Sequence, residues 1–379
     1  MTALEDTFRT RTGEAPSGTW FAPGRVNLIG EHTDYNDGFC MPFALPHRVT
    51  VAAGPRKDGQ WVITSQNKHE TVTVAPADLT PGRPGWSSYA AGVVWALRQA
   101  GYDIAGADLV LESDVPVGAG LSSSAALECA VLTALAELNG LDIAGMDRAR
   151  LARTAENEFV GAPTGLMDQA ASTLCTAGHA LFFDCRDLTV EQVPFDPATF
   201  GVEVLVLDTN TPHSLVDSEY AERRTSCHEA ARQLGVTALR EVSADGLGDA
   251  LTALADPLLR KRVRHVVTEN ERVRQARQAL RTGSLDELAP LLDQSHASMR
   301  DDFEITVPTV DLAVETARAA GALGARMTGG GFGGCIIALV PAGRTDEVGE
   351  EVARAFAEAG YAAPAWFTAT PSAGAGRLR

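Results

Sequence analysis

Apolar and polar residues alternate along the first part of the chain, in short runs that glycine, proline and aspartate interrupt. Residues 19–31 and 48–67 carry these alternating, β-branched runs. Period-two alternation is typical of strands with one buried face. The pattern therefore predicts an antiparallel sheet near the amino terminus.

The apolar spacing then changes to the helical period. Residues 86–101 predict a helix, 106–116 a strand, and 122–139 a second helix that is apolar nearly all round. A helix without a polar face is expected to be buried. Gly140 follows it where a C-cap glycine belongs.

Three amphipathic patterns predict long helices in the second half, at about residues 218–234, 258–281 and 284–300. The second has a strongly charged face, for which exposed helix surface is the default interpretation. A further helix at 309–321 leads into a glycine loop that enters a strand. Helices on one side of mainly antiparallel sheets, in two lobes, predict an α+β architecture.

The chain of 379 residues is long enough for two domains. Residues 187–201 are polar and contain two prolines, so we place the junction there and predict domains 1–190 and 191–379.

A formal net charge of −17 argues against nucleic acid or an anionic membrane as a partner, because basic patches bind both. No apolar run is long enough to cross a bilayer, and the amino terminus lacks a secretory apolar region. Six widely separated cysteines without zinc-site spacing are typical of buried free thiols in a reducing compartment. We expect a cytoplasmic protein.

The segment "VPVGAGLSSSAALE", residues 115–128, joins a predicted strand to the apolar helix. Gly118 and Gly120 allow close approach of a ligand, and the next residues carry the unpaired amides that begin a helix. Such amides bind phosphate without lysine, and the serines suit a phosphate oxygen or magnesium. The alternative is that Ser122 to Ser124 only cap the helix. The Gly-Lys-Ser/Thr ending of a Walker A loop is absent.

A second glycine cluster, "MTGGGFGG" at residues 327–334, comes before a predicted strand rather than after one. It is either a tight turn at a sheet edge or a second wall of the cleft that contains the first loop.

The segment "GRVNLIGEHTDYNDG", residues 24–38, concentrates polar side chains around an apolar centre, which suits a small, uncharged polar ligand. Arg25 belongs to it, and Glu156 and Asp168 lie in a later region of the chain. Phosphoryl transfer to an alcohol needs a carboxylate at the hydroxyl, an acid for magnesium and a cation for the transferring group. Asp168, Glu156 and Arg25 can fill these places.

Together, these three motifs resemble the galactokinase branch of the GHMP family of small-molecule kinases. Shorter matches include "ENEFVGAPTGLMDQ" and the carboxyl-terminal "TPSAGAG". The resemblance implies a two-lobed GHMP kinase fold, with a ribosomal-protein-S5-like amino-terminal domain and a ferredoxin-like carboxyl-terminal domain. It implies ATP-dependent phosphorylation of galactose at the anomeric hydroxyl, the first committed step of galactose catabolism, with Mg²⁺, by a monomer or weak homo-oligomer.

The resemblance also implies roles for individual residues. Asp168 and Arg25 are the expected catalytic residues. The expected sugar-binding residues are Glu31, His32, Thr33, Asp34, Gly165 and Tyr220. The expected nucleotide-binding residues are Ser65, Gly118, Ala119, Gly120, Leu121, Ser122, Ser123 and Ser124. Ser124 and Glu156 are the expected magnesium ligands.

Two alternatives remain open. A kinase of the same scaffold could act on N-acetylgalactosamine, arabinose or mevalonate. A non-catalytic sensor of galactose and ATP could instead control transcription, but such relatives lose part of the serine-alanine segment, which is intact here as "SSSAA".

Overall fold

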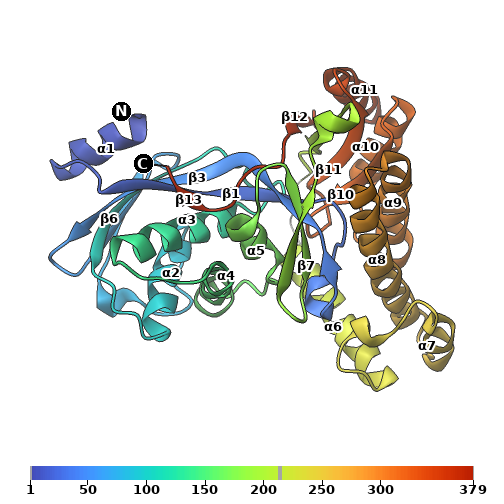
Figure 1. Cartoon of the computed structure of the whole chain (residues 1–379), viewed down its shortest axis with the longest axis horizontal. Coiled ribbons are helices and arrows are strands. Elements are labelled where there is room, and N and C mark those ends of the chain that lie inside the picture. Colours follow the sequence, from blue (N-terminus) through green and yellow to red (C-terminus); the bar gives the residue numbers. More distant parts are fainter. Residues whose placement is uncertain (1, 212–215, 379) are drawn as a thin grey trace.

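The computed structural model describes residues 2–211 and 216–378, which form two lobes side by side (Figure 1). The amino-terminal lobe contains a six-stranded sheet with the order β13-β1-β3-β6-β4-β5. Its strands are β1 (Gly18–Asn27), β3 (Pro42–Arg56), β4 (Trp61–Ser65), β5 (Glu70–Val74), β6 (Gly106–Ser113) and β13 (Gly376–Arg377). All neighbours are antiparallel except β4 and β6. The predicted antiparallel sheet is therefore confirmed.

Helices cover both faces of this sheet. The short helix α1 packs Leu4 and Phe8 against one face, and the other helices of the lobe lie on the opposite face (Figure 1). The helices are α1 (Ala3–Thr12), α2 (Ser87–Gln99), α3 (Ser123–Leu138), α4 (Gly145–Thr154) and α5 (Met167–Leu174), with one π-helix, η3 (Ala155–Val160). Helix α3 is buried along most of its length, and Gly140 follows it with a φ of 65°. Both predictions for this helix are confirmed.

The carboxyl-terminal lobe has a four-stranded sheet with the order β10-β11-β9-β12. Its strands are β9 (Val202–Asp208), β10 (Gly324–Thr328), β11 (Cys335–Pro341) and β12 (Ala365–Ala369). Alternate residues of β9 face opposite ways: Val204 and Val206 join a core shared with the first lobe, whereas Leu205 and Leu207 join the core of the second. The shared core holds the two lobes together.

The described part of the second lobe has α-helices at the four predicted places and two more, at residues 247–253 and 345–359, that the sequence analysis did not predict. They are α6 (Val216–Leu234), α7 (Leu247–Ala253), α8 (Pro257–Thr282), α9 (Leu285–Ser298), α10 (Pro308–Ala319) and α11 (Thr345–Ala359), with a π-helix, η6 (Met299–Phe303), after α9. The remaining short helices are η1 (Asp34–Asn36), η2 (Pro76–Asp78), η4 (Pro197–Phe200) and η5 (Leu239–Glu241). The α+β, two-lobed prediction is confirmed.

A small three-stranded sheet, β2 (Phe39–Cys40), β7 (His179–Asp184) and β8 (Thr189–Pro194), lies next to the two lobes. Strand β8 falls within the segment where we placed the domain junction. The division at residue 190 stays a prediction.

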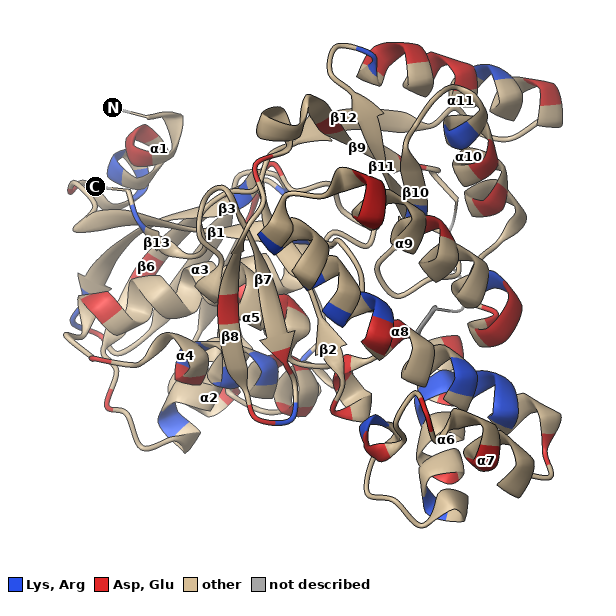
Figure 2. Ribbon diagram, turned by 45° about the vertical axis from the view of Figure 1, so that its right-hand side comes forward, with Lys and Arg blue, Asp and Glu red and all other residues tan. Residues whose placement is uncertain are grey.

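The interpretation of 258–281 as an exposed charged helix is wrong in part. Helix α8 carries charged residues along its length (Figure 2), but several of them are buried. His265 and Glu269 have no exposed surface, and Arg262 and Arg272 are nearly covered. Tertiary contacts cover this face: Arg262 bonds to the backbone of η6, whereas His265 and Glu269 also bond to the backbone at Glu31 and Gly30. Periodicity alone could not reveal these contacts.

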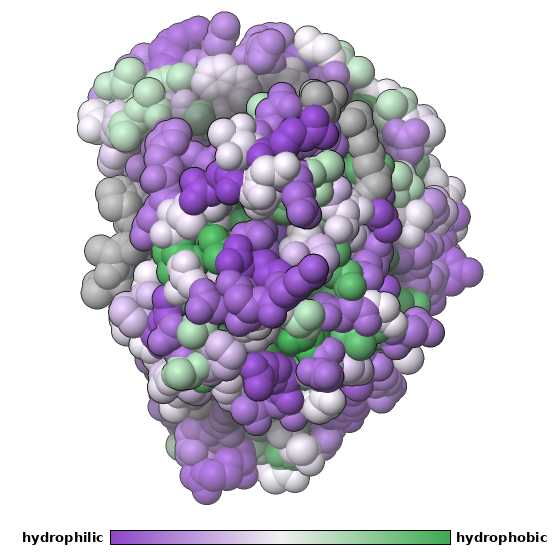
Figure 3. Space-filling view, turned by 90° about the vertical axis from the view of Figure 1, so that its left-hand side faces the viewer, coloured by the Kyte–Doolittle hydropathy of each residue, from purple (hydrophilic) through white to green (hydrophobic). Residues whose placement is uncertain are grey.

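The surface agrees with the composition. The face in Figure 3 is mainly hydrophilic, with small and scattered apolar patches. Within residues 2–211 and 216–378, no helix combines the length and the apolarity that a bilayer span requires. All six cysteines are free thiols and five are buried, as predicted.

Candidate active site

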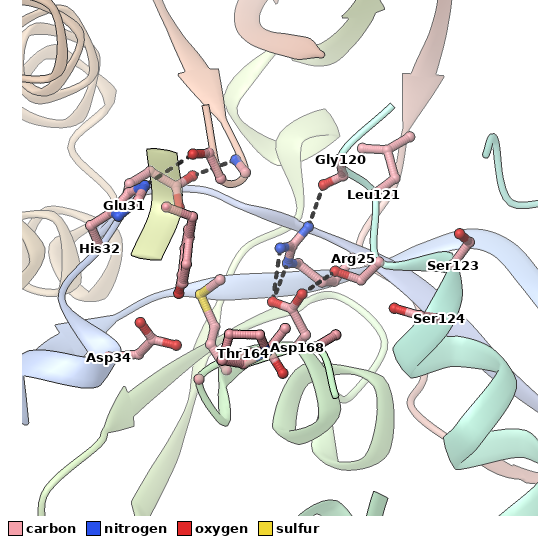
Figure 4. Close-up of a pocket in the computed structure, with 18 of the residues that line it drawn as sticks. Arg25, Glu31, His32, Asp34, Gly120, Leu121, Ser123, Ser124, Thr164 and Asp168 are labelled. Atoms are coloured by element: carbon pink, nitrogen blue, oxygen red, sulfur yellow. Dashed lines mark hydrogen bonds and ion pairs between the residues drawn. The ribbon is translucent and has the colours of Figure 1, made fainter. Parts of the chain in front are cut away.

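A cleft of about 290 Å³ brings together segments that are distant in the sequence. Most of the predicted site residues line it: Arg25, Glu31, His32, Asp34, Gly118, Gly120, Leu121, Ser122, Ser123, Ser124, Gly165, Asp168 and Tyr220. Figure 4 shows Arg25 and Asp168 in the middle, Glu31, His32 and Asp34 on one side, and Ser123 and Ser124 on the other. The cleft therefore has a polar end and a serine-lined end, with an ion pair between them.

The ion pair joins three elements. Arg25 at the end of β1 donates from Nε and Nη2 to Asp168 Oδ1, at 2.9 and 2.8 Å, and from Nη1 to the Gly120 carbonyl at 2.6 Å. Asp168 lies in the first turn of α5, and its Oδ2 accepts from Ser122 Oγ at 2.6 Å. Three donors converge on one carboxylate, so its position and orientation are fixed before a ligand arrives.

The interpretation of the serines as helix caps is wrong for Ser122. This residue precedes α3 in the left-handed conformation, with a φ of 59°, and its side chain makes no capping hydrogen bond. Its hydroxyl is directed to Asp168 instead. A strained backbone at this position is typical of a functional loop rather than of a simple cap.

The two glycine loops face the same cleft, as one of our two interpretations predicted. The second cluster connects β10 to β11, so it follows a strand as well as preceding one, which corrects the sequence-based placement. A Cβ atom on Gly329 would lie 3.0 Å from the Gly120 carbonyl oxygen. The absence of a side chain at Gly329 thus allows the two loops to come together.

Asp34 lies against Gly165 at the polar end. A Cβ atom on Gly165 would lie 1.6 Å from Asp34 Oδ2, so no other residue fits there without displacing the carboxylate. Burial, and then the charge of Asp168, raise the pKa of Asp34 to about 6. The carboxylate is ionised at neutral pH but poorly solvated, which favours a ligand that donates hydrogen bonds.

His32 is neutral in this site, because burial lowers its pKa to about 3. Its Nε2 lies 3.1 Å from the Gly330 carbonyl, which can only accept, so Nε2 carries the proton. Its Nδ1 then accepts from the Tyr35 hydroxyl at 2.7 Å. The imidazole therefore connects the polar loop, defined here as residues 30–39, to the second glycine loop.

Glu31 is held by three donors. Its Oε1 accepts from the Gly329 amide at 2.8 Å and lies 3.4 Å from Arg326 Nη2, and its Oε2 accepts from Asn27 Nδ2 at 2.9 Å. Burial raises the pKa of Glu31, and the charges of Arg326 and Arg25 oppose that rise. The carboxylate retains free lone pairs for a ligand after these contacts.

Four predicted residues do not line the cleft. Thr33 is buried, and its hydroxyl donates to the backbone of the polar loop. The Ser65 hydroxyl, at the end of β4, accepts a hydrogen bond from the Lys68 amide. Ala119 is fully buried within the loop of residues 118–124. Glu156 is nearly buried and is not among the residues that line the cleft.

Glu156 contacts two residues that do line the cleft. Its Oε2 accepts from Thr164 Oγ1 at 3.1 Å, and a hydrogen bond from the Ser124 side chain lowers its pKa. Burial has the larger effect, so the pKa of Glu156 is raised overall. In the described part of the chain, no group of three or more His, Cys, Asp or Glu side chains forms a metal-binding cluster. One carboxylate and a hydroxyl beside a phosphate cradle fit Mg²⁺, which takes few protein ligands when phosphates supply the others.

Sequence reasoning missed the residues of α8 that hold the polar loop. Glu269 Oε1 accepts from the Gly30 amide at 2.9 Å, and Asn270 Oδ1 accepts from the Phe39 amide at 2.8 Å. His265 Nε2 donates to the Glu31 carbonyl at 3.1 Å. His265, Glu269 and Arg272 follow the helical period, but an exposed charged face has the same period, so the sequence pattern could not show their burial.

Models of three protein families match the chain. The galactokinase galactose-binding signature matches residues 6–55, the GHMP kinase N-terminal domain matches 88–176, and the GHMP kinase C-terminal model matches 276–362.

Curated relatives match along nearly the whole length. The galactokinase of Streptomyces coelicolor is 53% identical over 374 residues, which cover 98% of this chain and 97% of the relative. The galactokinase of Mycobacterium tuberculosis H37Ra is 49% identical over 359 residues, 94% and 98% of the two chains.

Solved structures agree with these matches. The structure of Lactococcus lactis galactokinase complexed with galactose has a TM-score of 0.95 at 34% identity and covers 99% of both chains. A mevalonate kinase at 16% identity has a TM-score of 0.69, over 93% of this chain and 99% of its own, which shows the shared fold alone. From these matches and the geometry of the cleft, we conclude that the chain belongs to the galactokinases of the GHMP kinase family.

Proposed function

We propose that this galactokinase transfers the γ-phosphoryl group of ATP to the anomeric hydroxyl of galactose in the cleft described above, giving α-galactose 1-phosphate. The observation that carries the proposal is the Arg25–Asp168 contact, which lies between a polar end suited to a sugar and a serine loop suited to phosphates. The galactose-bound structure of the L. lactis relative supports the choice of sugar.

Galactose would bind at the polar end. Asp34 would accept hydrogen bonds from the adjacent 3- and 4-hydroxyls, with Glu31, His32, Gly165 and Tyr220 around the ring. A sugar with an inverted 4-hydroxyl would leave the partly buried Asp34 carboxylate poorly paired. Loss of such a hydrogen bond discriminates by roughly 10⁴-fold.

The nucleotide would bind along residues 118–124. Backbone amides at the start of α3 would hold the phosphates, aided by the positive end of the helix dipole. This arrangement needs no lysine, which agrees with the scarcity of lysine in the chain. Ser65 is a weaker candidate contact.

Ser124 and Glu156 would hold Mg²⁺ together with the phosphates. When bound, the ion neutralises charge on the phosphate oxygens. The chain itself contributes the fixed Glu156 carboxylate and the hydroxyl of Ser124.

Asp168 would orient the anomeric hydroxyl. The hydroxyl oxygen forms a bond to the γ-phosphorus while the bond to the bridging oxygen of ADP breaks, and the proton leaves to Asp168 or to solvent. Because Arg25 and Ser122 already donate to Asp168, positioning and electrostatics contribute more than proton abstraction. Arg25 also stabilises negative charge on the transferring group.

A substrate panel tests the function. The purified protein is incubated with ATP, Mg²⁺ and galactose, glucose, N-acetylgalactosamine, arabinose or mevalonate, and the product is identified by phosphorus and proton NMR. We expect α-galactose 1-phosphate, with kcat/KM for galactose roughly 10⁴-fold above that for glucose. A better substrate than galactose, or absence of phosphorylation, would contradict the proposal and favour a related kinase or a sensor.

Two expectations remain predictions: a cytoplasmic location, and a monomer or weak homo-oligomer. Light scattering at several protein concentrations would test the second.

A further inference from the structure

Glu128 is a buried carboxyl group that the proposed mechanism does not use. It lies on α3 one helical turn after Ser124, which places the two side chains on the same face. It has no exposed surface, and neither carboxyl oxygen has a hydrogen-bond partner among the described residues. An isolated buried carboxylate is strongly unfavourable, so its presence here needs an explanation.

The surroundings of Glu128 disfavour a negative charge. Burial raises the pKa of Glu128 well above its ordinary value. The Gln169 side chain lies within hydrogen-bonding reach of the Glu128 carboxyl group. A protonated Glu128 therefore fits this environment.

The orientation of Gln169 supplies an independent argument. Its Nε2 donates to Glu156 Oε2 at 2.6 Å, which fixes the amide with its oxygen directed elsewhere. That oxygen, Oε1, is buried and has no donor among the described residues. A buried amide oxygen beside a buried carboxyl group is satisfied if the carboxyl group carries a proton and donates it.

We propose that Glu128 is a neutral carboxylic acid whose O–H donates to Gln169 Oε1, so that Gln169 Nε2 in turn holds the Glu156 carboxylate in place beside Ser124. Glu128 and Gln169 are then positioning residues for the magnesium site. This inference rests on the proposed function, in which Glu156 and Ser124 hold the ion.

Two substitutions of Glu128 separate the neutral donor from a charged group. Glu128→Gln keeps an N–H donor toward Gln169 Oε1, whereas Glu128→Leu removes the donor at similar size. Gln169→Leu removes the side chain that would link Glu128 to Glu156 by hydrogen bonds. Thr133→Val, in the buried part of the same helix, is the matched control, because among the described residues Thr133 Oγ1 bonds only to the Cys129 carbonyl of its own helix.

Metal affinity is the main readout. Mn²⁺ binding is measured by electron paramagnetic resonance in the presence of a non-hydrolysable ATP analogue, at a pH where the wild type binds. Loss of an outer-shell partner typically weakens metal binding by about 10–100-fold, which we expect for Glu128→Leu and Gln169→Leu. Glu128→Gln and Thr133→Val are expected to bind close to wild type. Thermal unfolding of each variant shows whether it folds.

Infrared spectroscopy tests the proton directly in the folded wild type. The spectrum at neutral pH is expected to contain the C=O stretch of a protonated carboxylic acid that disappears in Glu128→Gln. This measurement decides the protonation state even if Glu128→Leu does not fold.

Three results would overturn the proposed hydrogen-bond chain from Glu128 through Gln169 to Glu156. The first is Mn²⁺ binding that is as weak in Glu128→Gln as in Glu128→Leu, and the second is unchanged binding in Glu128→Leu and Gln169→Leu. The third is the absence of the infrared band of a protonated carboxylic acid. Glu156→Gln distinguishes this failure from failure of the proposed function. If Glu156→Gln weakens Mn²⁺ binding but Glu128→Leu does not, only the hydrogen-bond chain is wrong. If Glu156→Gln has no effect, the metal assignment itself is wrong.

Discussion

Asp34 combines burial, a nearby negative charge and a neighbour without a side chain. Burial and Asp168 raise its pKa to about 6, and Gly165 leaves the carboxylate open to the cleft. In the free protein this charge is unfavourable, and a sugar bound as proposed, donating two hydrogen bonds to Asp34, would relieve it. A single residue would then connect sugar recognition to pH and to stability.

Galactose recognition is expected to weaken below pH 6. Protonated Asp34 loses acceptor capacity, so kcat/KM for galactose at saturating ATP should fall about tenfold per pH unit below the pKa of Asp34, about 6. A pH profile between 5 and 8 measures this. A flat profile across that range would contradict the assignment of Asp34.

The same shift predicts an effect on stability. The folded state has the higher pKa, about 6, against an ordinary value of 3.8, so the native state binds more protons between these values. The contribution of Asp34 to the free energy of unfolding should therefore fall as pH rises through this window. Asp34→Asn should unfold at a higher temperature than wild type above pH 6, while KM for galactose rises about 10–100-fold. Calorimetry at pH 5 and pH 8 compares the two proteins.

Asp168 is expected to be needed for turnover but not for folding. Asp168→Asn keeps the shape of the side chain but removes the negative charge facing Arg25, so kcat should fall by about 10²–10⁴-fold or more. The variant should still fold, but its unfolding temperature should be lower than that of wild type, because the nearly buried Arg25 loses its charge partner. Asp37→Asn is the control, because the Asp37 side chain lies in the polar loop, is 41% exposed and does not line the cleft. Normal turnover in Asp168→Asn would remove this residue from the mechanism.

At the scale of elements, helix α8 fixes the polar loop through hydrogen bonds from its side chains to the loop backbone. Glu269 accepts from Arg272 Nε at 2.7 Å, from Ser295 Oγ at 2.7 Å and from the Gly30 amide. Burial raises the pKa of Glu269. The charge of Arg272, with smaller contributions from other neighbours, more than offsets burial, so the pKa falls to about 2. The carboxylate is thus a fixed, ionised acceptor that the loop is built around.

Glu269→Gln is expected to destabilise the fold and loosen the loop. Removal of one partner of a buried ion pair typically costs about 3–5 kcal/mol, because the remaining charge is left uncompensated. We expect a lower unfolding temperature and a higher KM for galactose, with a smaller change in KM for ATP. Glu271→Gln on the exposed side of the same helix should change neither. Equal effects on both KM values would argue against a specific role in the loop.

At the scale of the molecule, the carboxyl-terminal segment connects the two lobes. After β12 it returns to the first lobe, where the Gly374 amide donates to the Cys175 carbonyl at 2.7 Å and the Ala375 amide to the Ser172 carbonyl at 2.8 Å. These carbonyls lie at the end of α5, the helix whose first turn contains Asp168. The "TPSAGAG" motif, residues 370–376, therefore helps to hold α5, and with it Asp168, in position.

Gly374→Ala tests this support. A Cβ atom at Gly374 would lie 2.6 Å from the Thr173 carbonyl oxygen, so the segment or α5 must move. Such overpacking typically costs about 1–3 kcal/mol, and a displaced α5 should also lower kcat. Gly248→Ala, where a Cβ atom would meet nothing within 4 Å, should change neither. Reduced stability with unchanged kcat would show that the segment does not position α5.

Sequence reasoning reached most of the fold because local patterns decide local structure. The apolar helix α3 and the strands β1 and β3 followed from their periodicity, and Gly140 followed from its place after α3. It failed where burial depends on a distant partner. The buried charged face of α8 is the clearest case, because its periodicity equals that of a solvated helix.

By itself, the sequence determined the elements, the two-lobed α+β class and the three motifs of the kinase family, since these depend on the order of residues along the chain. Tertiary structure alone decided that Ser122 bonds to Asp168 rather than capping α3, that α8 holds the polar loop, and that the buried Glu128 oxygens meet no donor among the described residues. The physical reason is that desolvation and pairing depend on which atoms approach in space, and residues far apart in the chain supply those atoms.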